Sequence, residues 1–597
     1  MGASSQADYT RADRDCDIVM KGGVTSGIVY PGAVCRLAET YRFRSIGGTS
    51  AGAIAAGATA AAEFGRRNGH PAAFRELEGL PRLLGEKDGS RRSLLMRLFR
   101  PDEPTRRAFE TLFAALRGPR AGAFAAARHY FLFGLLGAAP FVAIAAVEGY
   151  LERGRALPVT VTIVLCLLLS FVGFAAGVGF ALVSDLKRRI PENGYGLCSG
   201  MGASDALTPW LYDLYQRLAG RDRSLPLTFG DLSEGGSAKS IDLLVMTTNV
   251  THSRPYTIPL GARDEQRFFF RESDFRRLFP KEVVDWMVKN SPTRPNGARK
   301  DEFLKLPPSE KLPIIVGVRM SLSFPLLISA VPLYAIDYER GPGEGRTPEV
   351  CWFSDGGISS NFPVHFFDSP LPSRPTFAVN LRYLDSDPDP AEAVVMAEKN
   401  DSGVAEWFKR LRPGIGGFVG AVFESMQNWQ DNAQTRLPGW RDRIVHVCLG
   451  PGQGGVNLDM PAPLIETLSR RGDEAGRRLA SRFTGRDERS ELDWENHRWV
   501  RFRSTLAMLE ETFEKLAKRL DPADSLPTPG DKPYRELLER EVAALPSYRW
   551  TNEEQRRWAR EATKDLYELC AKWTASRERL RSEAPAPLPE LRPRPRV

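Results

Sequence analysis

The stretch FRSIGGTSAGAIAAGATAAAEF, residues 43–64, decides the fold. Residues 43–46 indicate a short strand, a tight glycine turn follows, and the small residues of 51–63 indicate a helix. Upstream, residues 16–20 indicate another short buried strand, and a helix pattern runs from 27 to 39. Strand, glycine loop, helix, strand, sharp turn and helix together predict an α/β fold.

The sharp turn contains Gly48-Thr49-Ser50-Ala51-Gly52. Gly-x-Ser-x-Gly between a strand and a helix is the pattern of a nucleophile elbow, in which the serine occupies a strained turn. Gly48 and Gly52 would keep larger side chains away from the strand and the helix. The helix N-terminus behind Ser50 would favour developing negative charge. The alternative is a glycine-rich turn that only packs a strand closely against a helix.

The glycine loop between the first strand and its helix is the candidate oxyanion hole. Consecutive backbone amides in such a loop can converge on an anion, which makes Gly22, Gly23 and Val24 the candidate donors. A phosphate-binding loop is disfavoured because no Gly-Lys-Ser/Thr ending follows. A purely structural turn stays open.

A serine nucleophile needs a base, and the six histidines give no triad context. Only 49 residues precede Ser50, too few for the strands that come before the nucleophile of an α/β-hydrolase. The better candidate base is Asp355, in Trp352-Phe353-Ser354-Asp355-Gly356-Gly357. Asp-Gly-Gly alone is usually a turn, so this assignment depends on its companions.

Taken as an ordered set, the glycine loop, Gly-x-Ser-x-Gly and the distant Asp-Gly-Gly resemble the patatin-like phospholipases. The resemblance covers roughly residues 14–64 and 186–400, and RMSLSFP at 319–325 is similar to the family's segment before the aspartate. It implies a three-layer fold with a central, mostly parallel sheet and a lipid acyl hydrolase without metal or other cofactor. The implied site is a Ser50–Asp355 dyad, supported by Gly22, Gly23, Val24, Gly48, Gly52, Gly356 and Gly357.

This sequence departs from the family pattern in its oxyanion loop, which is typically Gly-Gly-Gly-x-Arg/Lys-Gly. Val24 replaces the third glycine and Ser26 replaces the basic residue. Two alternatives to a hydrolase therefore remain: a weak or inactive membrane scaffold on a patatin-like fold, and a lipid transacylase.

Two apolar runs interrupt the globular pattern, at 130–147 and 157–183. A membrane-spanning helix needs ~20 apolar residues, and the second run contains no charge. The runs predict an antiparallel transmembrane hairpin, with Gly173 and Gly177 allowing close helix packing. Basic flanks on both outer ends predict a multi-pass membrane protein whose catalytic domain faces the cytoplasm. A pair of long core helices is the alternative.

The predicted organisation follows from these segments. The catalytic domain comprises 1–125 and 191–490, and the hairpin occupies 126–190. A charged helical region at 491–582 could bind a protein partner or a second copy, and a disordered Pro/Arg-rich tail covers 583–597. The substrate partner is a membrane phospholipid or other acyl lipid within the bilayer.

Composition excludes several other classes of function. A net charge of +8 over 597 residues is modest, so no nucleic acid is expected. Seven scattered cysteines predict neither a zinc site nor a disulfide framework. The glycine-rich loop at 450–455 has no helix directly after it, which disfavours nucleotide binding.

Overall fold

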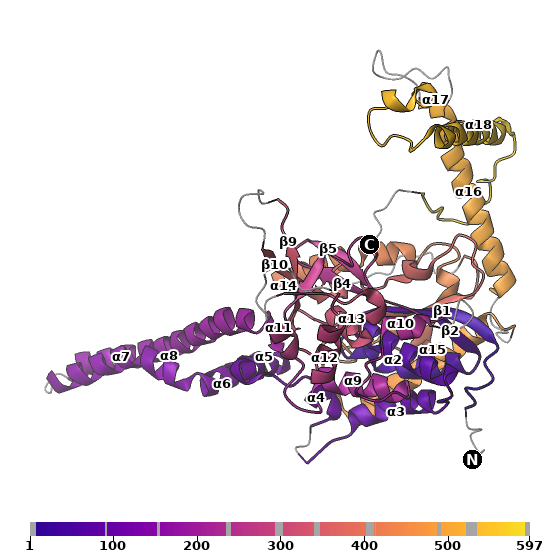
Figure 1. The fold of residues 1–597 in the computed structure, drawn as a ribbon. Coiled ribbons are helices and arrows are strands. Elements are labelled where there is room, and N and C mark those ends of the chain that lie inside the picture. The colour runs from indigo at the N-terminus through magenta and orange to yellow at the C-terminus, as the bar shows by residue number, and fades with distance from the viewer. Residues whose placement is uncertain are drawn as a thin grey trace.

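The computed structural model describes residues 7–89, 92–151, 156–234, 240–292, 303–339, 347–401, 411, 413–485, 491–520 and 534–591. Over these residues the chain forms an 11-stranded mixed sheet in the order β12-β13-β11-β1-β2-β4-β10-β9-β6-β7, with β5 paired to β4 (Figure 1). The strands are β1 (Arg14–Met20), β2 (Tyr41–Thr49), β4 (Asp242–Asn249), β5 (Arg254–Ile258), β6 (Phe268–Phe270), β7 (Leu304–Lys305), β9 (Val331–Ile336), β10 (Pro348–Asp355), β11 (Thr376–Tyr383), β12 (Val394–Val395) and β13 (Ile444–Leu449).

The five strands from β13 to β4 are parallel, and those beyond them on either side are antiparallel. Alternation along β1 directs Ile18 and Met20 into a large core and Val19 into a smaller core on the other face. The predicted α/β fold is therefore confirmed. The large core is covered by α1 (Tyr30–Ala38), α2 (Ala51–Arg67), α3 (Ala73–Gly85), α9 (Leu207–Leu218), α13 (Ile314–Ser321) and α15 (Ala462–Arg482).

Sheet register places the ends of two strands at the same level. Thr49, the last residue of β2, pairs with Met246 of β4, and the next residue of β4, Thr247, pairs with Asp355 of β10. Because antiparallel β10 pairs with only the last three residues of β4, its last residue lies level with the end of β2. Only β4 lies between the strands that carry Ser50 and Asp355. Its pairing with β2 and β10 places the two residues at the same height along the strands.

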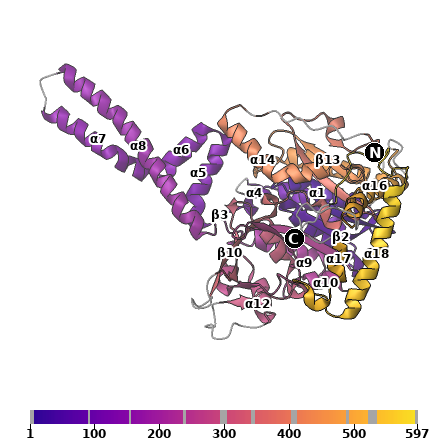
Figure 2. The ribbon, with the colours of Figure 1, turned by 90° about the horizontal axis from the view of Figure 1, so that it is seen from above.

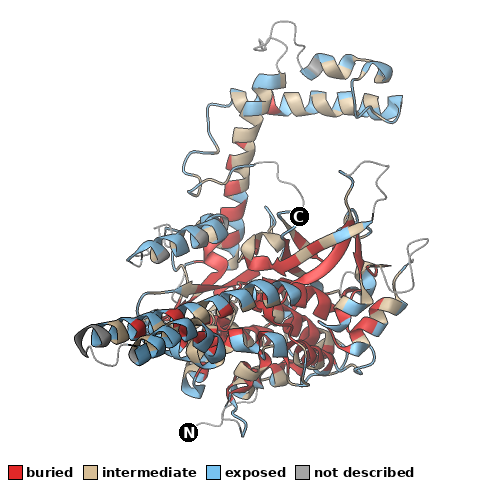
Figure 3. Cartoon of the chain, turned by 90° about the vertical axis from the view of Figure 1, so that its left-hand side faces the viewer, coloured by how far each residue is buried: buried red, intermediate tan, exposed pale blue. Residues whose placement is uncertain are grey.

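A long helical arm projects from the globular part (Figure 1). Two of its helices are long and apolar enough to cross a membrane by length and composition, over residues 131–148 and 160–192. Most of their side chains are exposed (Figure 3), which is unlike core helices. The arm consists of α5 (Arg106–Arg117), α6 (Pro119–His129), α7 (Phe131–Leu151) and α8 (Ala156–Glu192), and residues 152–155 of the predicted linker lie outside the described residues.

Small residues allow α7 and α8 to pack closely. A Cβ on Gly173 would lie 2.4 Å from the Gly137 carbonyl oxygen, and one on Gly177 would lie 2.3 Å from the Phe133 carbonyl oxygen. The predicted Gly-x-x-x-Gly face therefore lies in the helix–helix contact, as small residues do in membrane helix pairs.

The C-terminal region is helical, as expected from its composition. Its first helix is anchored in the globular part by a buried hydrogen bond of 2.6 Å between His497 Nδ1 and Asp442. The region contains α16 (Trp494–Leu520), α17 (Tyr534–Glu539) and α18 (Glu553–Ala575), and the described part of the predicted tail, residues 583–591, has no helix or strand.

Candidate active site

Ser50 has the backbone conformation of a strained elbow. It lies between β2 and α2 with φ 54° and ψ −127°, a region that non-glycine residues rarely occupy. Its side chain is buried, and its amide donates a hydrogen bond of 3.1 Å to Ser321 Oγ. Strain of this kind persists only where the surrounding structure holds it, and it is frequent at functional sites.

The two motif glycines are required by close backbone contacts. A Cβ on Gly48 would lie 2.3 Å from the Gly52 carbonyl oxygen, and one on Gly52 would lie 2.2 Å from the carbonyl oxygen of Met20 in β1. Larger side chains at either position would push α2 away from the sheet and move Ser50.

Asp355 is buried, and only one of its carboxyl oxygens is satisfied. Oδ1 accepts a hydrogen bond of 2.7 Å from the Gly357 amide, whereas Oδ2 has no hydrogen-bond partner among the described residues. Burial raises the pKa of Asp355 to about 6, and the nearby Ser50 hydroxyl and the Gly357 amide oppose this rise. A carboxylate with a free oxygen and a pKa near neutrality can accept a proton at ordinary pH.

The Ser50 hydroxyl influences the Asp355 pKa, but no hydrogen bond of ordinary geometry joins the two side chains in the described structure. Catalytic hydrogen bonds are often long before substrate binds. None of the hydrogen bonds of Ser50 or Asp355 within the described residues involves a histidine. His446 instead pairs with Asn380 at 2.9 Å, and His497 pairs with Asp442.

The two glycines after Asp355 have different surroundings. A Cβ on Gly356 would lie 2.0 Å from the Met246 carbonyl oxygen, whereas one on Gly357 would meet only side-chain oxygens at 2.8 Å. The first position therefore requires glycine, and the second can accept alanine after small side-chain shifts.

The segment 319–325 holds both candidate residues. Ser321 Oγ accepts from the Ser50 amide, and the Ser323 carbonyl accepts from the Asp355 amide at 3.0 Å. Arg319, which is fully buried, donates to Ser323 Oγ at 2.7 Å and to the carbonyls of Ser199 and Ser329 at 2.9 Å. Burial lowers the pKa of this guanidinium to about 10, and the cation binds carbonyl and hydroxyl groups that fix the segment.

The glycine loop offers two of its three predicted amides. The Gly22 amide is already bonded to the Asn361 carbonyl at 2.8 Å, so it does not face an open site in this conformation. The Thr25 amide is likewise bonded to the Gly455 carbonyl at 3.1 Å. Between them, the amides of Gly23 and Val24 make no hydrogen bond within the described residues, which leaves these two as candidate oxyanion donors.

Two residues near the loop were not identified from the sequence. The carboxylate of Asp431 accepts from Ser360 Oγ at 3.0 Å and from the amides of Asn361 and Phe362 at 2.8 and 2.9 Å. This fixes Asn361, whose carbonyl binds Gly22. Asp431 is buried, and burial raises its pKa to about 6. No sequence motif marks it, because its partners lie about 70 residues away.

The position of the missing basic residue is filled by a hydroxyl pair. The Ser26 hydroxyl lies 2.8 Å from the Tyr383 hydroxyl, and Ser26 is fully buried. A Cβ on Gly454 would contact Ser26 at 3.0 Å and Tyr383 at 3.1 Å. The glycine-rich loop at 450–455 therefore packs against the candidate oxyanion loop.

An apolar cavity of about 90 Å³ begins beside these groups. It is lined by Val24 of the loop, by Ala51 directly after Ser50, and by apolar side chains of α1, α2, α3, α4 (Leu94–Leu98) and α9. Such a lining suits hydrocarbon, although Ser50 and Asp355 are not among the residues that line this small cavity. Within the described part of the chain, no cluster of three or more His, Cys, Asp or Glu side chains could hold a metal ion.

Two comparisons with known proteins indicate the family of this chain. The model of the family described as patatin-like phospholipase matches residues 18–368, a range that begins in β1 and ends after Asp355. A curated relative from Rhizobium meliloti (strain 1021), described as an RpoH suppressor, is 36% identical over an alignment that covers 96% of this chain and 98% of the relative.

Proposed function

Because this chain belongs to the patatin-like phospholipase family, we propose that it is a membrane-anchored serine lipid acyl hydrolase with a Ser50–Asp355 dyad. The family supports lipid hydrolysis in general terms. The residues, the anchoring and the orientation are our proposal. The observation that carries it is the strained, buried Ser50 held level with a buried carboxylate that has one unsatisfied oxygen.

The proposed reaction begins when Ser50 Oγ attacks the acyl carbonyl carbon. Asp355 accepts the hydroxyl proton, and the carbonyl electron pair moves to an oxyanion that the Gly23 and Val24 amides stabilise. The tetrahedral intermediate collapses, the ester C–O bond breaks, and Asp355 returns the proton to the departing alcohol. Asp355 then takes a proton from water, whose oxygen attacks the acyl-enzyme carbonyl carbon. The bond between the acyl carbon and Ser50 Oγ breaks, Asp355 returns the proton to Ser50 Oγ, and the fatty acid leaves.

The test is fatty acid release from phospholipid vesicles by purified full-length protein. Ser50→Ala should lower the rate by at least ~10³-fold, because nucleophile and base act as a unit. The control is Ser224→Ala, on an exposed turn. Equal rates for wild type and Ser50→Ala would refute the proposed mechanism.

We also propose that α7 and α8 span the bilayer and that residues 1–125 and 191–490, which form the catalytic domain, face the cytoplasm. The exposed apolar surfaces and the glycine contact between the helices support the spanning arrangement. The basic residues that flank the hairpin on both outer ends support the cytoplasmic orientation. Cysteines introduced at Arg120 and Lys187 should react with an impermeant thiol reagent only from the cytoplasmic side. Reaction from the opposite side would contradict the proposed orientation.

A non-enzymatic membrane scaffold is the second candidate. It is favoured by Ser26 in place of a basic residue and by the bonded Gly22 amide. A fluorophosphonate probe separates the candidates: labelling of wild type that is lost in Ser50→Ala excludes the scaffold. A lipid transacylase shares the acyl-enzyme, so product analysis with an added acceptor lipid separates it from the hydrolase.

A further inference from the structure

Helix α14 (Ile415–Gln434) lies beyond the segment that the family model matches, and one of its faces is apolar and exposed. The apolar residues follow spacings of three, four and seven positions, which place them on one stripe of an α-helix. Each is exposed by 42% or more of its surface. This apolar stripe consists of Ile415, Phe418, Val419, Val422, Met426 and Trp429.

The opposite face of α14 points toward the candidate active site. Asp431 lies about half a turn away from the apolar stripe and binds residues 360–362, which in turn hold the Gly22 amide. Glu424 lies two turns before Asp431 on the same face. Burial raises the pKa of Tyr383, and the charge of Glu424 adds to this rise, which places Glu424 near the Ser26–Tyr383 pair. The helix therefore packs the Asp431 end of its polar face against the support of the oxyanion loop and presents its apolar face outward.

The apolar arm and α14 meet at the same side of the globular part. Figures 1 and 2 both show α14 near α5, at the base of the arm. At the end of α5, Arg117 forms an ion pair of 3.0 Å with Asp459. Asp459 lies just after the glycine-rich loop that binds Thr25 through Gly455. The base of the arm, the oxyanion loop and α14 therefore lie on the same side of the globular part.

Resting on the membrane anchoring proposed above, we propose that α14 is an interfacial helix whose apolar stripe enters the lipid surface beside the transmembrane hairpin. A helix with one apolar and one polar face lies in the plane of a membrane with its apolar side chains among the acyl chains. Trp429 and Met426, at the end of the stripe closest to Asp431, place the lipid next to the segment that supports Gly22. In this arrangement the oxyanion loop lies next to the bilayer that contains the substrate.

The assignment to lipid follows from the size and exposure of the stripe. Six large apolar side chains on one helix form a contiguous patch of a kind that monomeric soluble proteins rarely expose. Within the described residues, none of the six is buried against another element. An adjacent bilayer would remove all of them from water at once.

The test uses full-length protein reconstituted in vesicles of phosphatidylcholine and phosphatidylglycerol. A single environment-sensitive fluorophore is attached at Met426→Cys, on the stripe, or at Gln427→Cys, an exposed position on the polar side. The seven native cysteines are buried, which favours selective labelling. Brominated lipid should quench the label at position 426 at least about twofold more than the label at 427.

Equal quenching at the two positions would overturn the proposal. The proposal would also be overturned if the label at position 426 were shielded from water more strongly at higher protein density but were not quenched by brominated lipid. A second copy of the chain would then cover the stripe. The same measurement in Ser50→Ala protein reports insertion without catalysis. It therefore separates failure of this proposal from failure of the proposed hydrolase.

A second variant tests the consequence for activity. Met426→Glu/Trp429→Glu should lower hydrolysis of vesicle phospholipid by at least about tenfold, because two charges now oppose entry into lipid. Hydrolysis of a water-soluble short-chain ester should stay within about twofold of wild type, since neither side chain contacts Ser50 or Asp355. An equal loss on both substrates would instead assign these residues to folding and would contradict the lipid role.

Discussion

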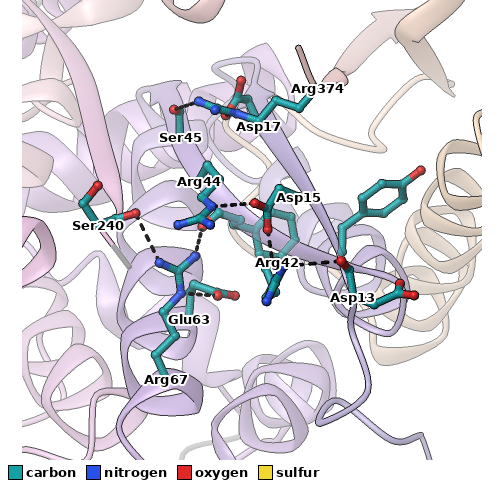
Figure 4. Close-up of polar contacts among 12 residues, drawn as sticks. Asp13, Asp15, Asp17, Arg42, Arg44, Ser45, Glu63, Arg67, Ser240 and Arg374 are labelled. Atoms are coloured by element: carbon teal, nitrogen blue, oxygen red, sulfur yellow. Dashed lines mark hydrogen bonds and ion pairs between the residues drawn. The ribbon is translucent and has the colours of Figure 1, made fainter. Parts of the chain in front are cut away.

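Two buried aspartates of the same sheet have opposite surroundings. Asp17, in the middle of β1, pairs with Arg374 at 2.8 Å, separately from the nearby ion pairs of Asp15 with Arg42 and Arg44 (Figure 4). Asp355, at the end of β10, has a single backbone donor and one unsatisfied oxygen. One sheet thus contains a buried aspartate that is ion-paired and another that is not.

The difference distinguishes an ion-paired carboxylate from the carboxylate proposed as the base. Burial raises the pKa of both groups, but the Arg374 guanidinium opposes the rise at Asp17. Among the described residues no cation opposes it at Asp355, whose pKa burial raises to about 6. A paired carboxylate stays ionised and stabilises the strands, whereas an unpaired one can exchange a proton near neutral pH.

The largest expected effect is on catalysis. Asp355→Asn keeps an acceptor for the Gly357 amide but cannot take the Ser50 proton. Fatty acid release should fall by ~10²–10⁴-fold, measured on phospholipid vesicles. Arg374→Ala, at the other end of the sheet, serves as the control and should keep its rate within about twofold. If Asp355→Asn kept the wild-type rate, Asp355 would not be the base, and its surroundings would have no catalytic meaning.

The same variant should gain stability at alkaline pH. A pKa of about 6 in the folded protein, against 3.8 for the unperturbed carboxyl, means that ionised Asp355 lowers the free energy of unfolding by about 3 kcal/mol. This loss develops as pH rises from about 4 to about 6. Asp355→Asn should therefore unfold at higher urea concentration at pH 8, and the gain should disappear at pH 4. A gain that is equal at both pH values would show a cause other than the charge.

Arg374→Ala should have the opposite effect on stability. It leaves Asp17 as a buried carboxylate without its cation, and we expect a loss of ~1–3 kcal/mol because the guanidinium is itself 39% exposed. The loss should be greatest at pH 8 and smaller in acid, because a protonated Asp17 needs no cation. Urea unfolding at both pH values checks this. A loss that grows in acid would contradict the assigned role of the ion pair.

The pH dependence of catalysis gives the next effect in size. If Asp355 is the base, kcat/KM should rise through about pH 6 and fall about tenfold for each pH unit below it. Arg374→Ala should leave this profile in place, since Asp17 takes no part in the reaction. A flat profile between pH 5 and pH 8 would exclude Asp355 as the titrating group.

The sequence was sufficient for the parts of the fold whose signals are local. The Gly-x-Ser-x-Gly pattern predicted the strained turn between β2 and α2, and the apolar runs predicted the two long apolar helices. Both features are specified by residues that are close together in the sequence. It was not sufficient for the support of the site. Asp431 and Asn361 act through tertiary contacts, and no sequence pattern indicates that the Gly22 amide is bonded to a carbonyl.

The same limit explains the two aspartates. Asp17 and Asp355 both end or interrupt apolar stretches, and their sequences alone do not say which one has a cation. Arg374 is 357 residues from Asp17, and the level of Asp355 relative to Ser50 depends on its register with β4. Pairing of distant strands, which no local pattern specifies, therefore decides which carboxylate is left unpaired.

The smallest expected effect is at the more exposed ion pair of Arg42 with Asp15, two residues before Asp17. Arg42 pairs with Asp15 at 3.0 Å, but its side chain is 45% exposed and Asp15 also pairs with Arg44 at 2.9 Å. Arg42→Ala should therefore cost less than about 1 kcal/mol, measured by urea unfolding beside Arg374→Ala, and activity should not change. A loss of stability as large as that of Arg374→Ala would mean that the ion pairs of Asp15 and Asp17 are energetically coupled. Burial of Asp17 alone would then not explain the stability of these strands.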